Sequence, residues 1–170
     1  GLGDVYKRQL PKVYGGFNTS LSWKGFDLSA IFAYSIGGYI YNRDITMILH
    51  NGSLEGRDWS TEILKRWTPD NRYTDVPALS TTSNDWNSAS TRFLQNNSYM
   101  RLKNLTLSYN LPKQWISKLS LSSVQVYVQG DNLFTIHRNQ GLDPEQGITG
   151  ITYYRYPAMR TISGGINVSF

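Results

Sequence analysis

The sequence predicts an all-β fold: an antiparallel, up-and-down sheet of about five strands that forms a segment of a transmembrane β-barrel and is an open sheet when isolated. Three observations lead to this fold class. Apolar and polar residues alternate with period two in five segments, which indicates strands with two differently solvated faces. The connections between the segments alternate between short and long, as in outer-membrane barrels. Aromatic residues lie at the strand ends that the short connections join.

The first two segments are predicted to form a hairpin. Residues 15–23 and 26–36 each carry apolar side chains on one face and mostly small polar side chains on the other, with Ile31 the one large exception. Lys24 and Gly25 separate the two segments, and glycine supplies the backbone angles that a two-residue turn requires.

Three further strands are predicted at residues 99–111, 122–134 and 162–170. In the first of these, Leu102 is out of phase with Leu105 and the apolar residues that follow it. This change of phase predicts a β-bulge near Lys103 and Asn104, because one inserted residue returns the apolar side chains to the same face.

Two long connections are predicted, at residues 37–97 and 135–158, and one shorter turn with a helical twist at residues 112–119. Within the longest connection, residues 61–67 are expected to form a short helix, with Ser60 as its cap and Thr68-Pro69 as its end. Connections of this length are unusual in compact domains and are often functional.

The lengths of the connections predict an orientation. If the end of the chain faces the periplasm, both long connections lie outside the cell and both short turns lie in the periplasm. The same orientation gathers one set of aromatic side chains at the periplasmic rim, where amphipathic rings form belts: Trp23, Phe26, Tyr109 and Phe170.

Composition excludes several classes of protein. The net charge is +5 and the sequence pI is about 9.4, but the 17 Lys and Arg residues are scattered, which argues against nucleic acid as a partner. The chain has no cysteine, so disulfides and thiolate metal sites are excluded. No apolar run has the length of a transmembrane helix, whereas a barrel strand needs only about 9–11 residues.

No constellation of residues predicts catalysis, a cofactor or a metal, so the sequence does not indicate an enzyme. The two histidines, His50 and His137, lack metal-binding spacing. Asp143 and Glu145 are interpreted as part of a loop turn started by Pro144. Arg101 and Lys103 are interpreted as rim or lumen charges near the outer end of their strand.

A second interpretation remains open on this pattern. A soluble β-sandwich that binds glycans would also show strands with alternating faces. Partition separates the two, because a barrel segment needs detergent and a soluble module does not.

Five stretches in order resemble the SusC/RagA-like TonB-linked outer-membrane nutrient transporters. They read PKVYGGFNTSLSWKGFDLSAIFAYSIGGYIYN at 11–42, RWTPDN at 66–71, NSYMRLKNLTLSYNLP at 97–112, VYVQGDNLFTIHRNQGLDPE at 126–145 and ISGGINVSF at 162–170. The resemblance covers about residues 11–170. Residues 1–10 lie outside it, and GLGDVYKRQ at 1–9 is interpreted as a truncation or assembly scar.

The resemblance implies that residues 11–170 are the C-terminal part of a TonB-dependent receptor barrel of about twenty-two strands in the outer membrane. Such transporters import oligosaccharides or peptides with a SusD-like surface lipoprotein that lids the barrel, and the TonB complex supplies the energy. The plug, the TonB-contact segment and the signal peptide are not found in this sequence, so the chain alone is not expected to transport.

The end of the chain also resembles the signal that the barrel-assembly machinery reads in such proteins. The pattern runs polar, any, Gly, any, any, apolar, any, aromatic, and its key positions are Ser163, Gly165, Val168 and Phe170. An edge strand of this kind is captured by addition to another sheet.

Aromatic residues of the long connections are the candidates for contact with cargo, since aromatic faces stack on sugars. The same rings serve equally as an outer aromatic belt or as lid contacts. They are Tyr39, Tyr41, Trp59, Trp86, Tyr153 and Tyr154.

Overall fold

The structure, a computed structural model, describes residues 9–50, 54, 56–80, 82, 88–139, 141–145, 150–152 and 155–170. The chain divides into two compact units. The sheet unit comprises residues 11–37, 97–145 and 156–170. The loop unit comprises residues 1–10, 38–96 and 146–155.

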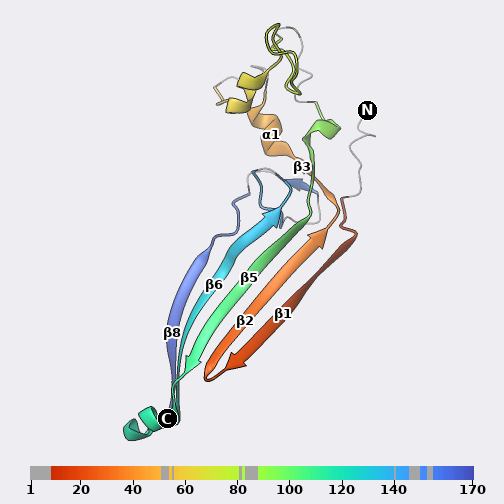
Figure 1. Ribbon diagram of the computed structural model, residues 1–170. Coiled ribbons are helices and arrows are strands. Elements are labelled where there is room, and N and C mark those ends of the chain that lie inside the picture. Colours follow the sequence, from red (N-terminus) through yellow and green to blue (C-terminus); the bar gives the residue numbers. More distant parts are fainter. Residues whose placement is uncertain are drawn as a thin grey trace. The chain divides into compact units, whose positions relative to one another are not determined.

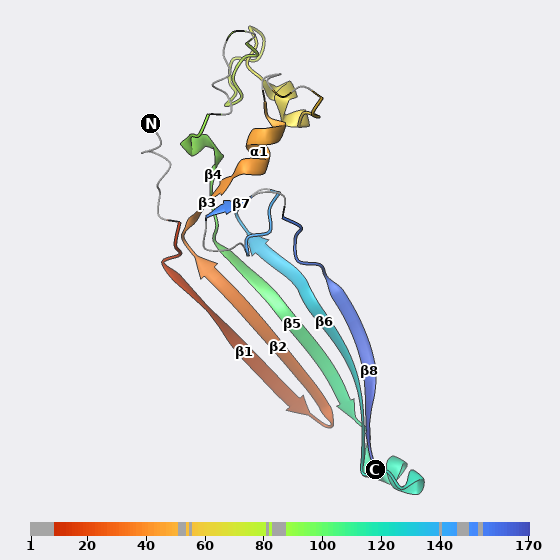
Figure 2. The same ribbon diagram turned by 180° about the vertical axis from the view of Figure 1, so that it is seen from behind.

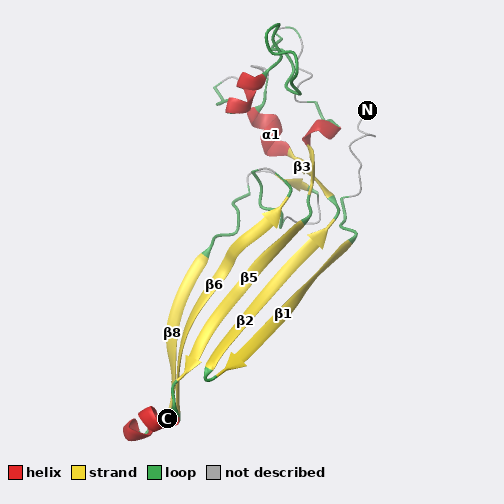
Figure 3. Ribbon diagram, viewed as in Figure 1, coloured by secondary structure: helices red, strands yellow, loops and turns green. Residues whose placement is uncertain are grey.

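The sheet unit is an open antiparallel sheet of five long strands, and this confirms the predicted fold class (Figures 1 and 3). The strand order is β1-β2-β5-β6-β8, so β1 and β8 form its two edges. The strands are β1 (Val13–Trp23), β2 (Phe26–Ile36), β5 (Tyr99–Asn110), β6 (Ser123–His137) and β8 (Thr161–Ser169). The fourth predicted strand is three residues too short at its end, because β6 continues to pair with β5 through Thr135, Ile136 and His137.

The two short turns are built as the sequence predicts. Lys24 and Gly25 join β1 to β2 with positive φ values of 46° and 88°, the combination of a tight hairpin turn. Between β5 and β6 the chain forms the short helix α2 (Lys113–Ile116) and the 3-10 turn η5 (Ser117–Leu119). Burial of Ile116 holds this connection in place.

The predicted bulge is present at Lys103. Residue pairing between β2 and β5 shifts there, since Phe32 pairs with Leu102 and Ile31 pairs with Asn104. The pairing between β5 and β6 shifts at the same place. The extra residue brings Leu102 and the leucines that follow it onto one face of the sheet.

Apart from the short helix near residues 61–67, the secondary structure of the loop unit was not predicted from the sequence. Three short strands form a second sheet of order β4-β3-β7, in which β3 and β7 are parallel (Figure 2). Its elements are β3 (Tyr39–Asn42), α1 (Arg43–Ile48), η2 (Thr61–Lys65), η4 (Thr91–Phe93), β4 (Leu94–Asn96) and β7 (Ile151–Thr152).

A small apolar core stabilises the described parts of this long connection. Ile40, Leu49, Ile63, Val76 and Phe93 are all buried. Their side chains come from positions far apart in the connection, so periodicity within a single segment gives no sign of them.

Caps define where the helices of the loop unit begin. The Asn42 side chain accepts a hydrogen bond from the Ile45 N–H at 3.1 Å and starts α1. Ser60 caps η2, as predicted, by accepting from the Glu62 N–H at 3.3 Å.

The predicted helix at residues 61–67 is shorter than expected and is a 3-10 helix that ends at Lys65. The Trp67 N–H donates to the Val76 carbonyl at 2.8 Å and therefore cannot continue the helix. Among the described residues, no helix has the length and apolar character to cross a membrane.

The hairpin turn gives a direct test of the fold. Replacing Gly25 by Val should lower the free energy of unfolding by about 1–2 kcal/mol, because an L side chain is strained at positive φ. A Cβ at this position would also lie 3.1 Å from the Asn110 carbonyl oxygen. Lys24→Asn is the control, since Asn tolerates the left-handed conformation at that position. Equal stability of Gly25→Val and Lys24→Asn in urea titrations would contradict the turn geometry.

Candidate functional site

The pairing of the five strands produces one continuous apolar face. Rows of paired residues on this face are largely apolar: one row is Leu21, Leu28, Leu107, Val128 and Gly164, and another is Trp23, Phe26, Tyr109, Val126 and Ile166. The rings of Phe17 and Phe32 stack in a third row, with their centroids 4.7 Å apart.

This apolar face is exposed. Leu21 is 66% exposed, Ile162 is 71% exposed and Ile166 is 64% exposed. A soluble sandwich would bury such a face beneath a second sheet, because large contiguous apolar surfaces are rare on soluble proteins.

The opposite face is polar and is connected by side-chain hydrogen bonds. Asp27 accepts hydrogen bonds from Ser22 at 2.5 Å and from Asn110 at 2.7 Å, which links the first three strands of the sheet. Further along the strands, Asn104 of β5 donates to Asp131 of β6 at 2.8 Å. The two faces therefore suit two different surroundings, one apolar and one aqueous.

A charge cluster occupies the polar face of β5, near the strand end from which the long connections leave. The side chain of Arg101 is almost fully buried and forms ion pairs with Asp143 at 2.5 Å and Glu145 at 2.8 Å. Its Nε also donates to the Thr135 hydroxyl at 2.9 Å. Lys103, the bulge residue, forms a second ion pair with Glu145 at 2.5 Å.

Asp143 holds two parts of the second long connection together. It accepts hydrogen bonds from the backbone N–H of Glu145 at 2.9 Å and of Ala158 at 2.6 Å. Burial raises the pKa of Asp143, but these backbone hydrogen bonds and Arg101 lower it more, so the pKa lies below its ordinary value. The stability that the charged group contributes is therefore present above the unfolded pKa and is lost as the pH falls through the folded pKa.

Asparagine side chains extend this anchoring. The Asn97 amide donates to the Pro144 carbonyl at 2.9 Å, and the Asn139 amide donates to the Asn97 side-chain oxygen at 3.1 Å. Sequence analysis interpreted Asp143 and Glu145 as residues of a local turn. The hydrogen bond from the Glu145 N–H to Asp143 is local, but both carboxylates also fix the connection to β5, 42–44 residues away.

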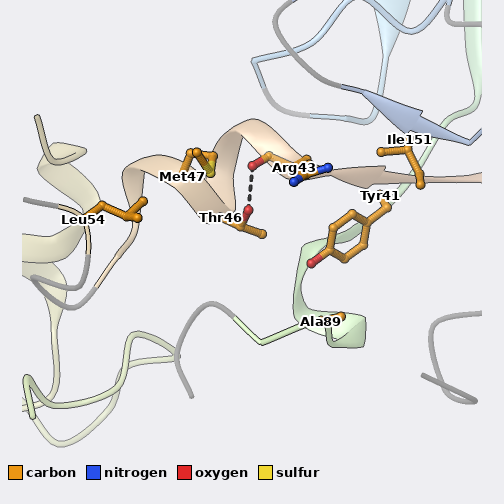
Figure 4. Close-up of a pocket in the computed structure, with 7 residues that line it drawn as sticks. All are labelled: Tyr41, Arg43, Thr46, Met47, Leu54, Ala89 and Ile151. Carbon is orange, nitrogen blue, oxygen red and sulfur yellow. Dashed lines mark hydrogen bonds between the residues drawn. The ribbon is translucent and has the colours of Figure 1, made fainter. Parts of the chain in front are cut away.

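The loop unit contains a pocket of about 450 Å³ beside α1 and β3. Figure 4 shows the Tyr41 ring extending from β3 toward the backbone near Ala89, with Arg43 and Thr46 on α1. Burial raises the pKa of Tyr41, and the nearby charge of Arg43 partly opposes this. The lining residues are Tyr41, Arg43, Thr46, Met47, Leu54, Ala89 and Ile151.

Three of the six aromatic candidates for cargo contact lie in the described residues. Tyr39 and Tyr41 are half-buried on β3. Trp59 is 43% exposed, and its indole N–H donates to His50 at 3.1 Å. Trp86, Tyr153 and Tyr154 lie outside the described residues. Contact with cargo stays a prediction for all six.

The candidate assembly signal lies on β8, at an edge of the sheet. Ser163 pairs with Gln129, Gly165 with Tyr127 and Val168 with Val124. A Cβ at Gly165 would lie 2.6 Å from the Tyr127 hydroxyl, so the tyrosine side chain covers this glycine. Phe170 follows β8 and is 92% exposed. Recognition of these residues by the assembly machinery stays a prediction.

The described residues contain no group of three His, Cys, Asp or Glu side chains that could hold a metal ion. The two faces, the charge cluster and the loop pocket are the main structural features of the described residues. They fit a barrel wall that separates an apolar from an aqueous environment and holds ordered connections.

Comparison with known proteins gives this architecture a family. No protein-family model matches the chain. It is similar to TonB-dependent receptor P3 of Formosa agariphila, with 34% identity over 166 residues, which cover 91% of this chain and 16% of that protein. It is also similar to TonB-dependent receptor SusC of Bacteroides thetaiotaomicron, with 28% identity over 98% of this chain and 16% of that protein.

Solved structures agree with the sequence comparison. A chain of the RagAB peptide importer in the "open-open" state matches with a TM-score of 0.83 and 35% identity, over 94% of this chain and 17% of that chain. The chain thus spans about a sixth of the length of the relatives that it matches. It belongs to the TonB-dependent receptor family, among the SusC/RagA-like members.

The charge cluster gives a testable consequence. Arg101→Met should lower stability by about 3–5 kcal/mol, because it leaves buried Asp143 without its cation. It should also make residues 138–145 susceptible to proteases in the folded protein. Lys103→Met is the matched control and should cost about 1 kcal/mol or less, since its ion pair with Glu145 is partly exposed. The role of Arg101 would be disproved by equal stability and equal proteolysis of the two variants.

Proposed function

We propose that this chain is the C-terminal portion of a TonB-dependent outer-membrane transporter that imports oligosaccharides or peptides. The observation that carries the proposal is the exposed apolar face across all five strands, opposite a hydrogen-bonded polar face. In a bilayer the apolar face contacts lipid and the polar face lines the lumen.

Neighbouring strands of the same protein complete the barrel in this proposal. β1 and β8 are edges in the described structure, and an unpaired strand edge is costly in lipid. The chain alone is then not competent for transport, and the energy comes from the TonB complex through a part of the protein outside this chain.

The proposal includes a lipoprotein partner of the SusD type at the outer surface. The order of the connections supports this placement, since both long connections leave the same end of the sheet and together contain the described helices and strands of the loop unit. Relatives named as a SusC receptor and as a peptide importer support import rather than catalysis. In this proposal, loop residues such as Tyr41, which lines the pocket, select the particular cargo.

The soluble glycan-binding sandwich is the weaker alternative. It requires a second sheet over the apolar face, whereas most of the large side chains of that face are exposed. The similarity to TonB-dependent receptors over nearly the whole chain also favours the transporter.

Labelling of single cysteines on intact cells tests the proposed topology. In the full-length protein, Tyr73→Cys in the loop unit should react with a membrane-impermeant reagent, because this fully exposed position faces the exterior. Ser117→Cys, which is exposed in the α2–η5 turn, should react only after the outer membrane is permeabilised. Labelling of Ser117→Cys but not of Tyr73→Cys on intact cells would reverse the proposed orientation.

Phe170 tests the proposed role of the chain end in assembly. Its deletion from the full-length protein should leave little protein in the outer membrane, whereas Phe170→Tyr should restore the level measured in membrane fractions. Loss of apolar contact alone costs at most about 1.5–3 kcal/mol, the value for a fully buried side chain, which is a small loss for a large barrel. Trp23→Ala is the control, since it removes an exposed aromatic residue at the same end of the sheet. Normal membrane levels after deletion would reduce Phe170 to an ordinary belt residue.

A further inference from the structure

Basic and aromatic side chains occur together where the short turns join the strands. We name Trp23, Lys24, Lys113, Trp115 and Lys118 the turn-end surface. The Lys24 ammonium lies 4.9 Å from the centroid of the Trp23 ring, so this cation rests over an indole of the apolar face. Trp23 and Trp115 are both 64% exposed.

The side-chain charge at this end is predominantly positive. The segments that form it, residues 22–27, 109–124 and 167–170, contain three lysines and one aspartate. The aspartate is Asp27, which points to the polar face and accepts hydrogen bonds from Ser22 and Asn110. Asp27 is therefore the one acidic side chain that these segments supply beside the lysines of the turn-end surface.

The larger turn has a defined structure that presents its side chains. Ile116 is 4% exposed and anchors α2, while the adjacent Trp115 remains outside. The Trp115 N–H donates to the Pro112 carbonyl at 2.9 Å, and Ser120 closes the turn in the left-handed conformation with φ of 55°. Lys113 and Lys118 are thereby held on an ordered turn beside the end of β8 (Figures 1 and 2).

We propose that the turn-end surface binds the headgroups of anionic phospholipids in the inner leaflet of the outer membrane. This inference rests on the proposed function, which places the turns at that leaflet. Indole rings favour the boundary between acyl chains and headgroups, and lysine side chains extend from that depth to the phosphates. An ammonium group gains more from a net negative headgroup, such as phosphatidylglycerol, than from a zwitterionic one.

Lipid is the occupant that the geometry favours over a periplasmic protein. Lys24 stands over Trp23, whose ring belongs to the row of apolar side chains that face lipid. A cation at this position is level with the edge of the apolar face, where phosphates of the leaflet lie.

A local quenching experiment tests the proposal on the full-length protein. Gln114→Cys carries an environment-sensitive dye, and the protein is reconstituted in phosphatidylcholine vesicles. Two quenchers are then compared, each added at a small mole fraction. They are phosphatidylglycerol and phosphatidylcholine, each with a nitroxide on the upper part of an acyl chain. The dye reports only on lipid beside α2, so the rest of the barrel does not dilute the signal.

The labelled phosphatidylglycerol should associate at least about fivefold more strongly than the labelled phosphatidylcholine, the scale expected for one lysine at an anionic surface. The variant Lys24→Gln/Lys113→Gln/Lys118→Gln should bring the ratio close to one, as should 1 M NaCl. The matched control Lys12→Gln/Arg138→Gln/Arg160→Gln removes the same charge from exposed positions at or beyond the outward-facing ends of the strands and should keep the preference.

The outcomes separate this inference from the proposed function. Equal quenching by both lipids in the unsubstituted protein overturns the lipid site and leaves the transporter intact. Loss of the preference in the control as well as in the lysine variant overturns the assignment to the turn-end surface. Absence of quenching by either lipid, with the protein remaining in the aqueous phase, overturns the proposed function itself.

Discussion

The register between the five long strands is the constraint on which the other features of the sheet depend. Side chains alternate between faces with a period of two, so a slip of one residue on any strand would put its apolar side chains on the polar face. Stacked pairs such as Phe17 with Phe32, and tilted pairs such as Phe26 with Tyr109, lie in directly paired positions and favour the observed register. The bulge at Lys103 keeps this arrangement over the full length of β5.

The same register determines where the chemistry of the polar face lies. Arg101 pairs with Thr135 across β5 and β6, which places its guanidinium within reach of the connection that follows β6. Lys103 reaches Glu145 because the bulge leaves it outside the regular pairing. The bulge at Lys103 and the ion pairs with Glu145 therefore form one structural feature. It fixes the connection after β6 to the sheet.

The main sheet was predictable from sequence because its signal is local. Alternation, the Lys24-Gly25 turn and the phase change at Lys103 each occupy a few consecutive residues, and each was predicted in the correct place. The ends of the strands were harder to predict from sequence. β6 continues to His137, which pairs with Tyr99 of β5, and this partner lies 38 residues away in sequence.

The loop unit and the charge cluster were not predictable in the same way. β3 pairs with a two-residue strand more than 100 residues further on, and such a short strand has no periodicity of its own. The partners of Arg101 are 42 and 44 residues distant. The signal that was available was two cations, Arg101 and Lys103, on one predicted strand, followed at long range by two closely spaced carboxylates. It indicates that a buried charge needs partners but does not identify them.

In the proposed barrel, one face of the sheet contacts lipid while the other contacts water. Leu105 and Thr106 offer the most direct test, because these neighbours lie near the middle of the central strand, are both half-buried and point to opposite faces. The measurement is the free energy of unfolding of the full-length protein in lipid vesicles for Leu105→Arg and Thr106→Arg. We expect Leu105→Arg to cost about 2–4 kcal/mol and Thr106→Arg to cost clearly less. Equal losses at the two positions, or a greater loss at Thr106, would contradict it.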